Sequence, residues 1–215
     1  METTEAPATC KESPAPVRRA RGRPLSFDRD KVLDQAMIVF WRQGYESASI
    51  HDLTAAMGIT APSLYAAFGD KAGLYREAIA RYRTGVGSYA ACLMEYPNDT
   101  RADVRALLEY GAKVMADPHT PSGCMIVLSG LNCGPQSEDI RVLLAGCRQD
   151  FETDLAARIQ HGIDAGDVAP SASPTALAKF YSTILAGMAV QARDGASHEV
   201  LLALCDSAMA AWPAR

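Results

Sequence analysis

Glycine and proline residues divide this chain into segments of helical length, and this division strongly constrains its fold. From Phe27 onward, apolar residues recur at spacings of three and four, and no segment shows the apolar/polar alternation of a half-buried strand. The expected helices cover approximately residues 28–43, 50–57, 61–68, 71–89, 101–117, 123–132, 136–164, 173–193 and 197–212. We therefore predict an all-α protein of about nine helices.

The composition excludes several classes of protein. The chain has 215 residues, of which 48% are hydrophobic and 21% charged, as in a globular protein with its own core. Its longest helix-like uncharged run, residues 180–192, has 13 residues, too few for a membrane span. Residues 1–23 contain no apolar segment of the kind found in secretory signals. We expect a cytoplasmic protein that does not enter the membrane.

The cysteines and histidines give no sign of a metal site or a catalytic site. The six cysteines form no CxxC pair, so we expect reduced thiols and no bound metal or cofactor. No nucleophile elbow, phosphate-binding loop or dinucleotide fingerprint is present, and the four histidines are dispersed along the chain. The sequence therefore predicts that the protein is not an enzyme.

Charge is distributed unevenly along the chain. Residues 17–83 hold 11 Lys or Arg against 7 Asp or Glu, whereas residues 84–215 hold 9 against 15. Four of the basic residues fall within six positions, at Arg18, Arg19, Arg21 and Arg23. This asymmetry favours a polyanionic partner for the N-terminal third of the chain.

Two short expected helices around Gly58-Ile59-Thr60 have the form of a helix-turn-helix. Ser49 can cap the first of them and Thr60 the second, with Pro62 in the first turn, where its missing N–H costs nothing. In a helix-turn-helix the second helix enters the major groove of DNA. The geometry alone fits a plain αα-hairpin equally well.

The longer run Gly22–Leu74 is more specific. It contains GRP, then FWRQGY, then SASIHDLTAAMGITAPSLYAAFGDKAGLY, and it resembles the N-terminal domain of the tetracycline-repressor (TetR) family of bacterial transcription regulators. The resemblance implies a three-helix DNA-binding domain followed by a helical domain for ligand binding and dimerisation. We accordingly divide the chain into a disordered basic arm (1–23), a helix-turn-helix domain (24–70) and a ligand-binding and dimerisation domain (71–215).

The resemblance also implies which residues contact double-stranded DNA. Thr60, Ala61, Pro62 and Ser63 open the recognition helix, and His51 lies where a polar residue often faces the groove. Tyr65, Lys71 and Ser49 are expected to meet phosphates. The alternative for Lys71 is a solvated surface charge. The four arginines of the arm are expected to follow phosphates or enter the minor groove, the alternative being a solvated tail.

The last two expected helices carry wide apolar stripes. In the TetR family the corresponding pair forms a four-helix bundle with a second copy, so we expect a homodimer. Burial within the same chain is the other interpretation of these stripes, and it is compatible with the dimer. The candidate interface residues are Leu177, Tyr181, Ile184, Leu185, Met188, Leu201, Leu204, Ala208 and Trp212.

The segment between these regions is rich in sulfur-containing and aromatic side chains, which can line an adaptable apolar pocket for a small-molecule effector. Ordinary core packing is the alternative for each of them. The candidates are Tyr89, Cys92, Tyr110, Met115, Cys124, Met125, Leu128, Cys147 and Phe151.

The predicted function is that of a DNA-binding transcription regulator, a repressor released from a palindromic operator by a small molecule. One alternative is a thiol-based sensor of oxidants or electrophiles that uses Cys124 or Cys133. Two more remote alternatives are an enzyme, for which no catalytic motif is present, and a DNA-binding protein without a sensor, for which the acidic helical region of about 130 residues has no evident use.

Overall fold

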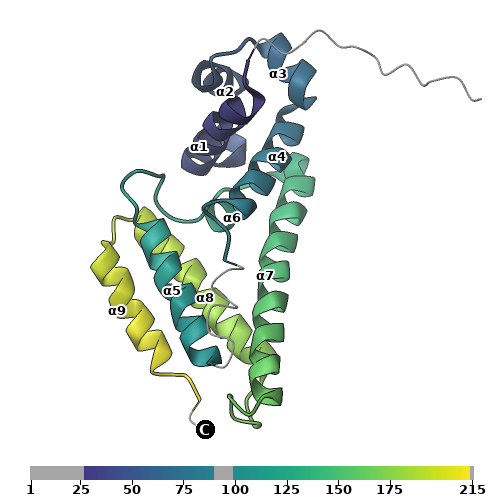
Figure 1. Cartoon of the computed structure of the whole chain (residues 1–215). Helices are drawn as coiled ribbons and strands as arrows, with labels where there is room; N and C mark the ends of the chain where they lie inside the picture. Colours follow the sequence, from purple (N-terminus) through teal and green to yellow (C-terminus); the bar gives the residue numbers. More distant parts are fainter. Residues whose placement is uncertain (1–26, 90–98, 214–215) are drawn as a thin grey trace, which may run out of the picture.

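The computed structural model describes residues 27–89 and 99–213, and within these ranges it is built of α-helices without any strand (Figure 1). This confirms the predicted all-α fold. None of the described helices is long and apolar enough to cross a membrane. The helices are α1 (Arg29–Ser47), α2 (Ile50–Met57), α3 (Ala61–Phe68), α4 (Lys71–Thr84), α5 (Thr100–Met115), α6 (Met125–Leu128), α7 (Glu138–Asp164), α8 (Pro174–Arg193) and α9 (His198–Met209).

Two helices are shorter than the sequence predicts. Helix α4 ends at Thr84 and does not continue past Tyr89, because Gly85 caps it and the chain then folds back so that Gly87 N–H donates to the Tyr82 carbonyl. The expected helix over 123–132 is reduced to the four residues of α6. Gly123, at a φ of 83°, turns the chain before α6 starts. The arm expected to be disordered, residues 1–23, lies outside the described residues.

The helices form two units with a shared connection (Figure 1). Helix α1 packs on α2 and α4 to form a head unit, and the lower unit is made of α7 packed on α8 and α5 packed on α8 and α9. Helix α4 starts in the head and runs down to the lower unit, and α6 contacts α1, α4, α7 and α8. The boundary predicted at residue 70 therefore falls just before a helix that packs in the head.

The head has an aromatic core. Phe40 and Trp41 on α1 are buried, and their rings meet Tyr75 and Tyr82 on α4 edge to face, with centroids 4.9 and 5.0 Å apart. Leu53 of α2 is fully buried in the same cluster. The α1–α4 pair is thus the frame on which the two short helices are mounted.

A buried ion pair fixes α7 against α5 in the lower unit. Arg158 Nε lies 2.6 Å from the Asp103 carboxylate, and Arg158 Nη1 donates to Thr100 Oγ1 over 2.6 Å. Both partners of the ion pair are almost fully buried. Gly162, on the next turn of α7, permits this close approach, since a Cβ there would lie 2.1 Å from Thr100 Oγ1.

Gly44 interrupts α1 near its C-terminal end. Its backbone has φ 80° and ψ 172°, a combination that is accessible almost only to glycine. A Cβ at this position would also lie 3.2 Å from the Ser129 carbonyl oxygen. The break lets the next residue, Tyr45, donate its N–H to that same carbonyl over 3.0 Å.

We expect Gly44→Ala to lower the free energy of unfolding by about 1–3 kcal/mol, because alanine is strained in this backbone conformation. Chemical denaturation followed by circular dichroism measures this change. Gly146→Ala is the matched control, because Gly146 lies inside α7 with open space at its Cβ position, so alanine there is expected to be neutral or stabilising. Equal stability of both variants would contradict the assigned strain.

Candidate DNA-binding surface and internal cavity

The turn between α2 and α3 is fixed by local geometry. Gly58 ends α2 in the left-handed region at φ 65°, and Thr60 caps α3 by accepting the Ser63 N–H. Leu53 and Leu64 bury the inner sides of the two helices in the head core. The outer side of α3 therefore faces solvent, and Tyr65 on it is 46% exposed.

Several predicted DNA-contacting groups already have partners within the chain. The Ser49 hydroxyl accepts the Asp52 N–H, and both the Ser49 hydroxyl and N–H donate to the Asp52 carboxylate, which lowers the pKa of Asp52. The start of α2 thus holds an acid of its own, which the sequence prediction for Ser49 did not consider. Thr60 Oγ1 and Ser63 Oγ lie 3.0 Å apart. His51 and Pro62 are exposed, and Ala61 is half-buried.

Lys71 lies folded against the end of α1. Its ammonium donates to the Glu46 carbonyl over 3.2 Å and sits 4.6 Å from the centroid of the Tyr45 ring. Partial burial lowers the pKa of Lys71. The Glu46 carbonyl uses one of the three ammonium donors, which leaves two for a phosphate contact.

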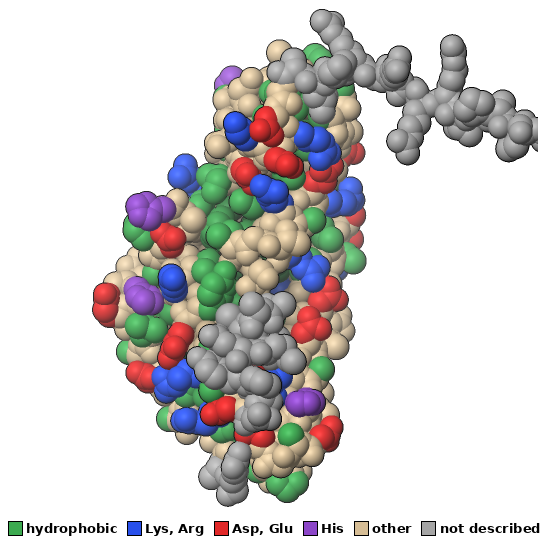
Figure 2. Space-filling view, in the orientation of Figure 1, with side chains coloured by type: hydrophobic (Ala, Val, Ile, Leu, Met, Phe, Trp, Pro, Cys, Tyr) green, Lys and Arg blue, Asp and Glu red, His purple; other side chains and the backbone are tan. Residues whose placement is uncertain are grey.

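The described part of the head carries no net charge. Residues 27–83 contain seven Lys or Arg and seven Asp or Glu, and on the face shown in Figure 2 the two signs are interspersed. Arg29 and Arg81 are paired with Glu77 and Asp34 inside the head. The basic excess of the N-terminal third thus resides in Arg18, Arg19, Arg21 and Arg23, which lie outside the described residues.

A cavity of about 680 Å³ opens between the end of α4 and helices α5, α6, α7 and α8. This volume lies within the usual range for small-molecule sites. Five of the predicted pocket residues line it, namely Tyr89, Met115, Cys124, Cys147 and Phe151.

The remaining pocket candidates lie elsewhere. Tyr110 donates its hydroxyl to the Val86 carbonyl over 3.1 Å and packs its ring against Tyr89, and it does not line the cavity. Met125 is fully buried and Leu128 half-buried, and neither lines the cavity. Cys92 lies outside the described residues.

Charged side chains also line the cavity, and sequence reasoning missed them. They come mostly from α7 and are Arg83, Arg148, Glu152, Asp154, Arg158, His161 and Lys179. Long charged side chains on a helix usually face solvent, which is why they were not considered. A signal was available, because residues 147, 151, 154, 158 and 161 recur at helical spacing on one side of α7.

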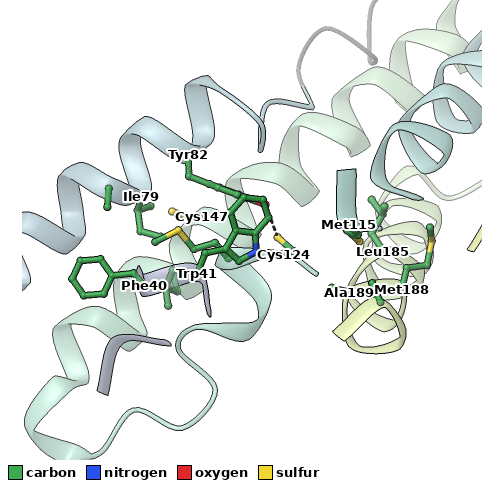
Figure 3. Close-up of a cluster of buried hydrophobic side chains, with 14 of the residues drawn as sticks. Phe40, Trp41, Ile79, Tyr82, Met115, Cys124, Cys147, Leu185, Met188 and Ala189 are labelled. Carbon is green, nitrogen blue, oxygen red and sulfur yellow. Dashed lines mark hydrogen bonds between the residues drawn. The ribbon is translucent and has the colours of Figure 1, made fainter. Parts of the chain in front are cut away.

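Residues 123–129, which we call the strap, join the cavity to the head. Trp41 Nε1 donates to the Gly123 carbonyl over 3.2 Å. The Tyr82 hydroxyl donates to Cys124 Sγ over 3.6 Å, and Figure 3 shows this bond. At its other end Ser129 accepts the Tyr45 N–H and bonds the Tyr75 hydroxyl. The strap therefore contacts α1 and α4 while its Cys124, Ile126 and Val127 line the cavity.

Most of the residues predicted for the dimer interface on α8 and α9 pack inside the single chain. Tyr181, Leu185, Met188, Leu201 and Ala208 are buried within their own chain, so they are unavailable to a partner. They face inward because α8 packs on α5 and α7, and α9 packs on α5 and α8. Leu177, Ile184 and Trp212 are half-buried, and Leu204 is exposed.

A different set of apolar residues faces outward on these two helices. Phe180 and Val190 on α8 are 39% and 41% exposed, and Val200 and Leu204 on α9 are 51% and 38% exposed. A Cβ at Gly187 would meet open space. These residues form an outward face that the sequence stripes only partly identified.

Comparisons with known proteins agree with this architecture. Residues 32–78 match the family model described as bacterial regulatory proteins of the tetR family, and residues 101–206 match that of a tetracyclin repressor-like C-terminal domain. The HTH-type transcriptional repressor ComR of Escherichia coli (strain K12) is 35% identical over 204 residues, covering 92% of this chain and 94% of ComR. The repressor BdcR of the same organism is 33% identical, covering 86% and 89%.

Among solved structures, the TetR family transcriptional regulator CifR, a cysteine mutant in complex with 26-bp double-strand operator DNA, has a TM-score of 0.85 and 42% identity. The match covers 89% of this chain and 100% of the CifR chain. With these relatives, both family domains and the helix-turn-helix geometry in place, the chain belongs to the tetR family and is a DNA-binding transcription regulator rather than an enzyme.

Proposed function

We propose that this regulator is a repressor that binds a palindromic operator as a homodimer and is released when a small molecule occupies the cavity. The observation that carries the proposal is the strap, because its residues line the cavity and are hydrogen-bonded to α1 and α4. The names of ComR and BdcR as repressors and the operator complex of CifR support the DNA-binding half.

The release step follows from how α3 is held. Helix α3 leads through Gly69 and Asp70 into α4, and α4 contacts the strap through the Tyr82 hydroxyl and the Tyr75 hydroxyl. A ligand that displaces the strap therefore displaces α4 and, with it, the recognition helix. Two recognition helices must fit successive major grooves about 34–36 Å apart, so a small change in their separation lowers affinity. The effect is limited by the ligand's preference between the two conformations.

The proposal is tested by native mass spectrometry of the purified protein for a co-purifying small molecule, combined with selection of binding sites from random DNA. We expect the selected sites to be palindromic and the co-purified molecule to weaken binding to them. Selected sites without two-fold symmetry would contradict the dimeric binding mode. An unchanged operator affinity at saturating ligand would contradict release.

The DNA-contacting residues remain as the family resemblance implies, and Tyr65 is an exposed member of the proposed phosphate contacts. Because the head carries no net charge, its affinity for DNA must come from positioned hydrogen bonds, helix N-termini and the arginine arm. The exposed Tyr65 hydroxyl on α3 suits such a contact.

We expect Tyr65→Phe to weaken binding to operator and random DNA alike by roughly tenfold, because it removes one hydrogen bond to a charged phosphate. The salt dependence of binding should stay unchanged, since tyrosine carries no charge. Fluorescence anisotropy titrations at several salt concentrations measure both quantities. Tyr89→Phe, a change in the cavity, serves as the control. Loss of operator preference with intact binding to random DNA would instead indicate a base contact.

The dimer is assigned to the outward face of α8 and α9, defined by Phe180, Val190, Val200 and Leu204 with the half-buried Leu177 and Ile184. Gly187 in the middle of this face would let a second copy of α8 approach closely. An apolar face of this kind is typical of a self-complementary interface.

We expect the protein to sediment as a dimer at micromolar concentrations and Leu204→Asp to shift it to a monomer, because a charge is costly to bury in an apolar interface. Val142→Asp is the control, because Val142 is an exposed apolar residue on α7 outside this face. Sedimentation velocity distinguishes the species. A monomeric parent protein, or an equal effect of both substitutions, would refute the assignment.

A second candidate function, the electrophile sensor, is favoured for Cys124 by one observation, since Cys124 lines the cavity and accepts a hydrogen bond from Tyr82. Burial raises the pKa of the Cys124 thiol. Burial also raises the pKa of Cys133, with the nearby carboxylates of Glu46 and Asp139 acting in the same direction. Neither thiol is therefore activated toward oxidants in bulk solvent. An electrophile sensor loses operator affinity when an electrophile is added. If Cys124→Ser abolished this loss and Cys133→Ser retained it, the result would favour an electrophile sensor over reversible ligand binding.

A further inference from the structure

Four of the seven charged or titratable side chains that line the cavity are balanced by neighbours, namely Arg83, Glu152, Arg158 and Lys179. Arg158 is paired with Asp103, Arg83 lies 3.3 Å from the Asp150 carboxylate, and Lys179 is paired with Glu152. Ser182 donates its hydroxyl to the other Glu152 oxygen over 3.2 Å. These groups have little residual demand for an ionic ligand.

Arg148 differs from them. It is half-buried on α7, and within the described ranges no carboxylate oxygen lies within 4 Å of its guanidinium. Its Nη1 donates instead to the Ile126 carbonyl in α6 over 3.0 Å. One neutral carbonyl uses a single donor of a group that has five and leaves its charge uncompensated. Within the described part of the chain, Arg148 therefore has free N–H donors and an unpaired positive charge at the cavity, and both can be used by an anionic hydrogen-bond acceptor.

The surroundings of Arg148 restrict what that acceptor can be. The same cavity presents the aromatic ring of Phe151 and the apolar side chains of Met115 and Leu185. The carboxylate of Asp154 on the same helix lines it as well, has no ion-pair partner within the described ranges, and would repel a multiply charged anion. One uncompensated guanidinium beside an apolar wall matches a single planar anion on an apolar body.

We infer that the cavity binds an apolar molecule with one carboxylate group, and that Arg148 holds the carboxylate. This inference rests on the proposed function, because it names the chemical class of the effector. The bound carboxylate occupies donors of the same guanidinium whose Nη1 holds the Ile126 carbonyl, so it acts directly beside the contact between α7 and α6. Because α6 lies within the strap, the ligand's anionic end acts at the point where the cavity is connected to the head.

The test compares two fluorescent probes that share one body, dansylglycine, which carries a carboxylate, and dansylglycinamide, which is neutral. Both are titrated against the full-length protein and against Arg148→Met, which keeps the bulk of the side chain without its charge. Arg141→Met is the matched control, because it removes an exposed cation paired with Glu138 on the same helix. Arg148→Lys keeps the positive charge but lacks the planar guanidinium that can donate two parallel hydrogen bonds to one carboxylate.

We expect the parent protein and Arg141→Met to bind dansylglycine about tenfold or more tightly than the amide, the gain of a charge-assisted hydrogen bond. Arg148→Met should lose this preference while binding the amide as before, which also shows that its cavity is folded. Arg148→Lys should retain part of the preference.

Equal binding of both probes by the parent protein, a preference retained in Arg148→Met, or no binding of either probe would overturn the inference. Failure of the proposed function is seen elsewhere, in an unchanged operator affinity with the co-purified molecule. If the protein preferred the carboxylate probe but the co-purified molecule left operator affinity unchanged, the carboxylate site at Arg148 would stand and the proposed release from the operator would be refuted.

Discussion

The indole N–H of Trp41 is buried in the head, where it must find an acceptor, and it finds the Gly123 carbonyl in the strap. Breaking this bond without a replacement would cost about 1–3 kcal/mol, because a buried donor would be left unsatisfied. The Tyr82 ring packs edge to face on Trp41, so α4 is attached to the same contact (Figure 3). Any displacement of the strap is therefore transmitted to both helices on which α2 and α3 are mounted.

The net charges of the two units differ, and this difference bears on which of them contacts DNA. Residues 27–83 are neutral and residues 84–215 have an excess of acids, so neither attracts DNA by net charge. The acidic lower unit repels DNA and leaves the head as the contact surface. In the proposed function, long-range attraction is assigned to the four arginines between residues 18 and 23, and the positioning of contacts to the head. Affinity and operator recognition can thus change independently.

The sequence predicted features that depend on local chemistry. The caps at Ser49 and Thr60 and the turn at Gly58 were predicted because each depends on residues within a few positions. Features that depend on distant partners were not predictable. The helical spacing of apolar residues in α8 predicts that Tyr181 is buried. It cannot show whether the same chain or a second copy buries it, and in the structure the same chain does. Likewise, nothing near Lys71 in sequence indicates that the end of α1 holds its ammonium.

The two ends of the cavity differ in stiffness. This difference determines which end would move if a ligand expanded the cavity. At the far end the buried Arg158–Asp103 pair fixes α7 to α5, and removing one partner of such a pair is strongly destabilising. At the near end α6 has four residues and no side-chain cap, so its own hydrogen bonds add little stability. A ligand that expands the cavity meets less resistance from α6 than from α5. In the proposed function, the strain of ligand binding is therefore expected to pass to the strap and, through Trp41 and Tyr82, to the proposed recognition helix.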